Sequence, residues 1–164
     1  RGWMIAATTQ DPEHVPLDLR WRLLRGNPIA QSAAAARTRV LREIGGYDER
    51  ARHAEDYDLW IRLARTTTFA CAHAITATYR RHAAQTTEDF ATMRHAAWRV
   101  RLRAAEELAA TGDAERERVQ RTLLEAWEAE LAGEWRARCT DNLDVVLGLR
   151  ALVPGSASAY ARWQ

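Results

Sequence analysis

Apolar residues recur every three or four positions through the second half of the chain, which is the spacing of one face of an α-helix. A first helix is predicted from the stripe Phe90, Met93, Ala97, Val100, Ala104 and Leu108. After a break at 111–113, a second follows from Val119 to Trp135, and a third covers about 141–152. Residues 88–164 are therefore predicted to form an α-helical C-terminal region.

The first half carries shorter helical patterns. One is predicted at 17–24, between prolines, and another at 38–44, where Thr38 can serve as the cap. Gly45 follows at the position where a left-handed C-terminal cap is wanted. A further helix is predicted at 55–64, which puts Asp56 at its start.

Two segments of the first half read as strands. Residues 29–36 form a small-residue strand candidate, and FACAHAITATYRRH, at 69–82, alternates β-branched and aromatic residues up to about Arg80. The fold class predicted is therefore α/β, mixed and helix-rich. Residues 1–87 are expected to be the mixed part and 88–164 a helical extension packed on it.

Composition narrows the classes of function. The formal net charge is only +2, although every basic residue is arginine, so we expect no nucleic-acid partner. Cys71 and Cys139 stand far apart without the spacing of a zinc or redox motif. No apolar run reaches the roughly 20 residues that span a bilayer, so a cytoplasmic location is expected. Peripheral contact with a membrane is left open.

The acidic stretch GGYDERARHAEDYDLW, at 45–60, is the main candidate for chemistry. Asp56 lies in the first helical turn, where the macrodipole and free amides favour an ionised carboxylate, whereas Glu55 and Asp58 raise its pKa. These opposed influences suit a general base. The alternative is that the acidic residues only complement the helix dipole. Asp56 and Asp58 are not expected to share a metal ion, because helix residues two apart point about 200° away from each other.

Four segments in order, NPIAQSAAAART, VLREIGGYDE, EDYDLWIRLA and YRRH, resemble the C-terminal half of the catalytic domain of family 2 glycosyltransferases. The resemblance covers roughly residues 27–87. It implies the GT-A fold and transfer of a sugar from a nucleotide-sugar donor to an acceptor hydroxyl, with inversion. The acceptor would be a glycan or a lipid-linked molecule, and the reaction would take place in the cytoplasm or at the inner face of the membrane.

The same resemblance implies roles for individual residues. The active-site wall beside the donor sugar would consist of Gly45, Gly46, Tyr47 and Asp48. Asp56 would be the catalytic base and Glu55 its neighbour. Trp60 and Arg62 belong to the same family signature, here EDYDLWIR.

A divalent metal ion and phosphate contacts are implied as well. His82 would be a ligand or neighbour of Mg²⁺ or Mn²⁺ on the donor diphosphate, and Arg80 or Arg81 would contact phosphate. Taken by itself, His82 is better explained as a surface or hydrogen-bonded histidine than as a metal ligand.

The resemblance also implies that a nucleotide-binding half with the main metal motif precedes residue 1. We therefore expect this chain to be part of a longer enzyme. The competing hypothesis is a non-catalytic module, in which the long helices bind a partner and the glycosyltransferase-like part is a remnant.

Overall fold

The computed structural model describes residues 19–69, 77–78, 90–131 and 143–153. Within these residues the regular elements are all helices: α1 (Leu19–Arg25), the 3₁₀ turn η1 (Gln31–Ala33), α2 (Thr38–Glu43), α3 (Glu55–Leu63), α4 (Phe90–Ala109), α5 (Asp113–Leu131) and α6 (Leu143–Leu152). The predicted α/β GT-A-like half-domain is therefore wrong for the part of the chain that the structure describes. The predicted C-terminal helices are confirmed where they are described.

The strand predicted at 29–36 is instead an irregular segment around η1. The backbone N–H groups of Ala33 and Ala34 bond to carbonyls three residues earlier, at 3.0 and 3.2 Å. Five of the seven residues after Ile29 are alanine and the other two are Gln31 and Ser32, so this part lacks the branched and aromatic side chains that fit a pleated surface. Most of the second strand candidate, 69–82, lies outside the described residues.

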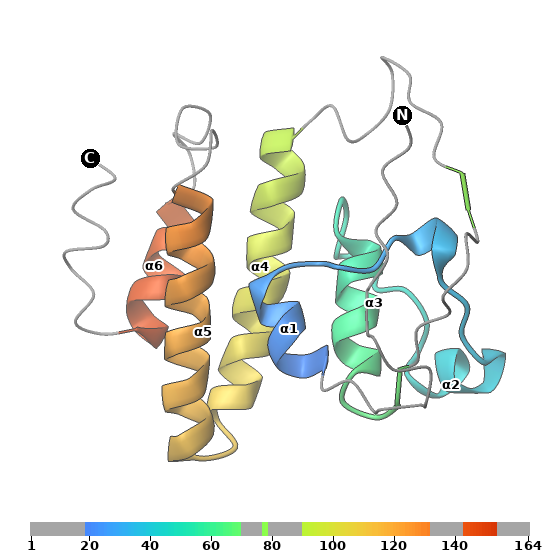
Figure 1. Ribbon diagram of the computed structural model, residues 1–164, viewed down its shortest axis with the longest axis horizontal. Helices are drawn as coiled ribbons and strands as arrows, with labels where there is room; N and C mark the ends of the chain where they lie inside the picture. Colours follow the sequence, from blue (N-terminus) through green and yellow to red (C-terminus); the bar gives the residue numbers. More distant parts are fainter. Residues whose placement is uncertain (1–18, 70–76, 79–89, 132–142, 154–164) are drawn as a thin grey trace.

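The long helices α4 and α5 run antiparallel, joined by a short turn at 110–112 (Figure 1). Helix α1 packs against both of them, and α6 packs against α4. Helix α3 contacts α1 and α4, while α2 stands at the far end of the molecule (Figure 1). Residues 19–69 and the described C-terminal helices therefore share one hydrophobic core.

Large apolar side chains from α1, α3, α4, α5 and α6 fill this core. Its fully buried members include Leu23, Leu24, Leu59, Leu63, Trp98, Val119, Leu123, Trp127, Val145 and Leu149. Each large side chain of this kind stabilises the fold by about 1.5–3 kcal/mol when it leaves water. Trp98 and Trp127 meet edge to face, with ring centroids 5.2 Å apart. The predicted stripe of α5 therefore faces the interior at Val119, Leu123 and Trp127. In the predicted stripe of α4, Val100 and Ala104 are buried, whereas Met93, Ala97 and Leu108 are only half-buried.

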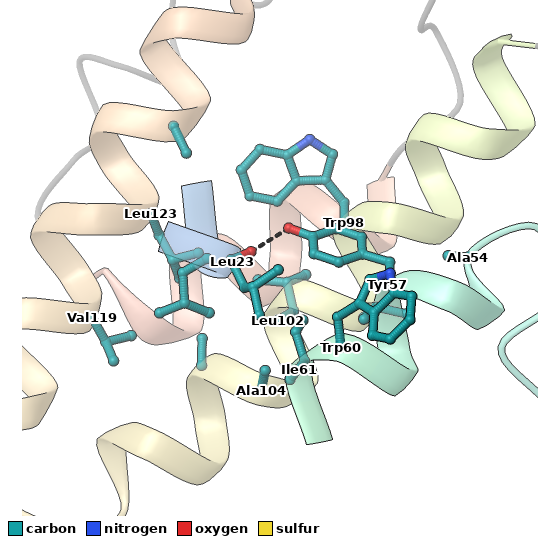
Figure 2. Close-up of a cluster of buried hydrophobic side chains, with 14 of the residues drawn as sticks. Leu23, Ala54, Tyr57, Trp60, Ile61, Trp98, Leu102, Ala104, Val119 and Leu123 are labelled. Atoms are coloured by element: carbon teal, nitrogen blue, oxygen red, sulfur yellow. Dashed lines mark hydrogen bonds between the residues drawn. The ribbon is translucent and has the colours of Figure 1, made fainter. Parts of the chain in front are cut away.

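Tyr57 connects three helices near the centre of this core. Its hydroxyl donates to the carbonyl oxygen of Leu23 in α1 (Figure 2). The same hydroxyl accepts a hydrogen bond from Nε of Arg101 in α4 at 3.0 Å. Arg101 continues to Glu130 of α5 at 2.7 Å. This chain of polar contacts fixes α3, and with it the acidic stretch, relative to the bundle.

Candidate functional site

The two glycines of the acidic stretch end helix α2. Gly45 and Gly46 have φ of 82° and 68°, a left-handed backbone that glycine adopts without steric cost. The N–H of Gly46 bonds to the carbonyl of Leu41 at 2.9 Å, and that of Gly45 to the carbonyl of Arg42 at 3.1 Å. These two bonds form a Schellman motif, so the predicted left-handed cap is confirmed. Helix α2 begins after Arg37, and Thr38 is its first helical residue rather than the predicted cap.

Open space adjoins both glycines. A Cβ atom placed on Gly45 or Gly46 would meet no heavy atom within 4 Å. The need for glycine here is therefore set by the backbone angle. The same open side leaves the backbone of the turn accessible to another molecule.

Arg62 of α3 ties this turn to the acidic helix. Its guanidinium donates to the carbonyl oxygens of Ile44 at 2.9 Å and Gly46 at 2.7 Å, and its Nε donates to Oδ2 of Asp58 at 2.8 Å. One side chain thus satisfies two carbonyls at the end of α2. The result is that the turn and α3 form one unit.

Asp58 is a structural residue. Only 2% of it is exposed, and its carboxylate is paired with both Arg62 and Arg103 of α4. A carboxylate so buried is stable as an ion only when it is paired and hydrogen-bonded. Asp58 therefore joins α3 to the helical bundle. The spacing of Asp58 and Arg62, four apart in a helix, is a sequence signal that could have identified this pair.

Asp48, predicted to line the donor site, also takes part in ion pairs. Its carboxylate accepts hydrogen bonds from the side chain and backbone of Arg50, which lower its pKa to about 2, and Arg103 lies 3.5 Å away. Asp48 is therefore ionised at neutral pH and already partnered. Nothing in the sequence pairs Arg103 with it, because 55 positions separate them.

Asp56 has a different environment. It lies in the first turn of α3, as predicted, and is partly buried. Oδ1 accepts the N–H of Tyr57 at 2.7 Å and Oδ2 accepts Nδ2 of Asn27 at 3.3 Å. Its pKa is raised, first by burial and also by the negative charge of Glu55. Sequence reasoning anticipated the effect of Glu55 but not the burial or the contact with Asn27.

The raised pKa of Asp56 makes its carboxylate a better proton acceptor. The ionised carboxylate is a stronger base than an ordinary aspartate, and it carries no guanidinium partner among the described residues. Of the three aspartates in the acidic stretch, Asp48 and Asp58 are neutralised by arginine, and Asp56 is left able to accept a proton.

The remaining predicted site residues fall into three places. Glu55 is exposed beside Asp56, and Tyr47 is 49% exposed, its hydroxyl accepting Nε2 of Gln31 at 2.8 Å. Trp60 is buried in the core, with its Nε1 lacking a hydrogen-bond partner. Arg80 and His82 lie outside the described residues.

The described residues contain no ready metal centre: no group of three or more of their His, Cys, Asp or Glu side chains is arranged to hold a metal ion. Asp48 and Asp58 are paired with arginine, and His82, the predicted neighbour of Mg²⁺ or Mn²⁺, lies outside the described residues. Among the helices from 19 to 153 that the structure describes, none is both long and apolar enough to cross a bilayer.

Comparison with protein-family models, with curated proteins and with solved structures finds no match to this chain. Evidence about the chemistry of this site therefore comes from its own residues.

Proposed function

We propose that this chain supplies the general base of an inverting glycosyltransferase, and that Asp56 is that base. The observation that carries the proposal is the contrast within one acidic stretch. Asp48 and Asp58 are held by arginines, whereas Asp56 is partly buried, has a raised pKa and accepts hydrogen bonds only from neutral donors among the described residues. Such an environment suits proton transfer from a hydroxyl.

The neighbouring turn gives further support. Arg62 links helix α3 to the carbonyls of Ile44 and Gly46, and the open side of the two glycines lets a ligand approach the backbone. A sugar hydroxyl can donate to a carbonyl oxygen of this turn, which has a second lone pair, whereas the N–H groups of Gly45 and Gly46 are already bonded to Arg42 and Leu41. Tyr47 adds an exposed aromatic ring beside this turn. The turn at Gly45 and Gly46 is proposed to line the binding site of the donor sugar.

The proposed reaction is a single displacement at the anomeric carbon of the donor sugar. The acceptor hydroxyl oxygen forms a bond to the anomeric carbon while its proton passes to the carboxylate of Asp56. The bond from that carbon to the diphosphate oxygen breaks, and the nucleoside diphosphate leaves with the electron pair. Attack from the face opposite the leaving group inverts the configuration.

The proposed partners are a nucleotide-sugar donor and a glycan or lipid-linked acceptor. The proposed location is the cytoplasm, at the inner face of the membrane if the acceptor is lipid-linked. A divalent ion would offset charge on the leaving diphosphate, but the described residues do not form its site. No step assigned to Asp56 depends on it.

The test uses the full-length protein that contains this chain. It is incubated with a panel of uridine and guanosine diphosphate sugars, Mn²⁺ and simple glycan or lipid acceptors, and nucleoside diphosphate release is measured. Asp56→Asn should lower transfer by about 10²–10⁴-fold, the range for loss of a general base, and should retain donor binding. Asp113→Asn, at a 94% exposed side chain on α5, should match the wild type. Undiminished transfer in Asp56→Asn would refute the role.

A non-catalytic module is the second candidate, with the C-terminal helices as its partner-binding part. Leu147 of α6 is 54% exposed, so a partner that covers α6 would bury it. If no donor in the panel is bound or turned over by the wild-type protein, this candidate replaces the enzyme.

A further inference from the structure

We propose that Asn27 is a positioning residue for Asp56: its side-chain amide orients the carboxylate and keeps it ionised for proton transfer. This inference deepens the proposed function and depends on it for its catalytic meaning. The contact itself joins two segments 29 positions apart, with Nδ2 of Asn27 lying 3.3 Å from Oδ2 of Asp56.

The amide of Asn27 is held in one orientation. Its Oδ1 accepts the backbone N–H of Ile29 at 3.1 Å, which closes an Asx turn around Pro28. Only the carbonyl oxygen can accept that N–H, so the two ends of the amide cannot be exchanged. With Oδ1 engaged at Ile29, Nδ2 is the end that faces Asp56.

The backbone carrying Asn27 is also fixed to helix α3. Asp56 and Tyr57 are neighbours in α3, and each contacts the end of α1 or the loop that follows it. Tyr57 donates to the carbonyl of Leu23, and Asp56 accepts from Asn27. The adjacent residues Asp56 and Tyr57 thus hold the chain at Asn27 and at Leu23. Held at both positions, the loop after α1 cannot turn independently of the Asp56 carboxylate.

The two oxygens of Asp56 then have separate tasks. Oδ1 accepts a short hydrogen bond from the N–H of Tyr57 at 2.7 Å, whereas the contact of Oδ2 with Asn27 is longer, at 3.3 Å, so Oδ2 is the less strongly bound oxygen. Donation from Asn27 favours the ionised form and counters the burial that raises the pKa of Asp56. Oδ2 is therefore the oxygen assigned to take the acceptor's proton.

Two variants test this without requiring transferase activity. Asn27→Asp keeps the acceptor for the N–H of Ile29 but replaces the donor by a negative charge, and Asn27→Leu removes both interactions. The pKa of Asp56 is followed by ¹³C carboxyl NMR on the full chain, with Asp56→Asn identifying the resonance. Both variants should raise the pKa, Asn27→Asp more than Asn27→Leu. Gln120→Leu, which removes an amide from α5, should leave it unchanged.

The outcomes separate this inference from the proposed function. An unchanged pKa in both variants overturns the role of Asn27, whatever the enzyme assay gives. A raised pKa together with no transfer by the wild type refutes the enzyme but retains the orientation of Asp56. Where transfer is measurable, Asn27→Asp should lower kcat at least 10-fold, about 1.4 kcal/mol in barrier, with little change in KM. A loss confined to KM would contradict positioning.

Discussion

Asp56 and Asp58 show how strongly local environment decides the role of a residue. They stand two positions apart in one helix and therefore face different directions. Asp58 points into the protein and is neutralised by two arginines, whereas Asp56 faces Asn27 and keeps a raised pKa. The paired carboxylate of Asp58 stabilises the fold, whereas the partial burial of the ionised Asp56 lowers the stability of the folded state.

The stabilising role of Asp58 can be measured. Asp58→Asn leaves Arg62 and Arg103 without their shared counter-charge. Breaking a fully buried pair costs about 3–5 kcal/mol. Because the arginine side chains are 26% and 43% exposed, we expect a loss of about 2–3 kcal/mol in the free energy of unfolding by urea. Asp113→Asn removes an exposed pair with Arg116 and should cost less than about 1 kcal/mol. Equal losses in both variants would contradict a special role for Asp58.

At the scale of elements, the sequence predicts the helices well, whereas the one strand candidate that the structure fully describes, 29–36, is wrong. The three- and four-residue spacing of apolar side chains predicts α4 and α5, and Gly45 marks the end of α2, since these signals are local. The strand predicted at 29–36 is wrong because alanine, which fits several backbone conformations, occupies five of these eight positions, and Ile29 is the only branched side chain that favours a strand. Element identity is therefore predictable where side chains restrict the backbone.

The end of α2 offers a sharp test of such a restriction. Gly46→Ala places a Cβ in open space, so its cost comes from the left-handed backbone alone, about 1–2 kcal/mol. At Gly26 a Cβ would also enter open space, but the backbone there does not have a positive φ. The free energy of unfolding of Gly26→Ala should therefore be unchanged or higher by up to about 1 kcal/mol. Thermal and urea unfolding of the two variants provide the comparison. A neutral Gly46→Ala would mean that the turn adopts another backbone in solution.

At the scale of the whole molecule, the site depends on contacts that no local pattern encodes. The contacts of Asp56 with Asn27, Asp58 with Arg103, and Tyr57 with Leu23 join segments 29 or more positions apart. Sequence reasoning selected Asp56 correctly as the start of a helix, but it could not supply these partners. Arginine is so frequent in this chain that its spacing alone does not indicate which arginine pairs with which carboxylate.

Tyr57 contacts both Leu23 and Arg101, so one substitution at this residue tests two long-range contacts. Burial raises the pKa of its phenol, so the hydroxyl stays protonated and donates to the carbonyl of Leu23. Tyr57→Phe leaves that carbonyl and Nε of Arg101 unsatisfied, which should cost about 1–3 kcal/mol. Tyr47→Phe, at an exposed hydroxyl, should cost about 0.5 kcal/mol or less.

Hydrogen exchange locates the effect of Tyr57→Phe within the molecule. If Tyr57 holds α1 against α3, the amides of α1 should lose protection more than those at the centre of α5, because α1 is short and depends on tertiary contacts. The loop bearing Asn27 follows α1 directly, so the pKa of Asp56 should also shift upward in this variant as the donor moves away. Unchanged protection of α1, with an unchanged Asp56, would show that the bundle orients the carboxylate without Tyr57.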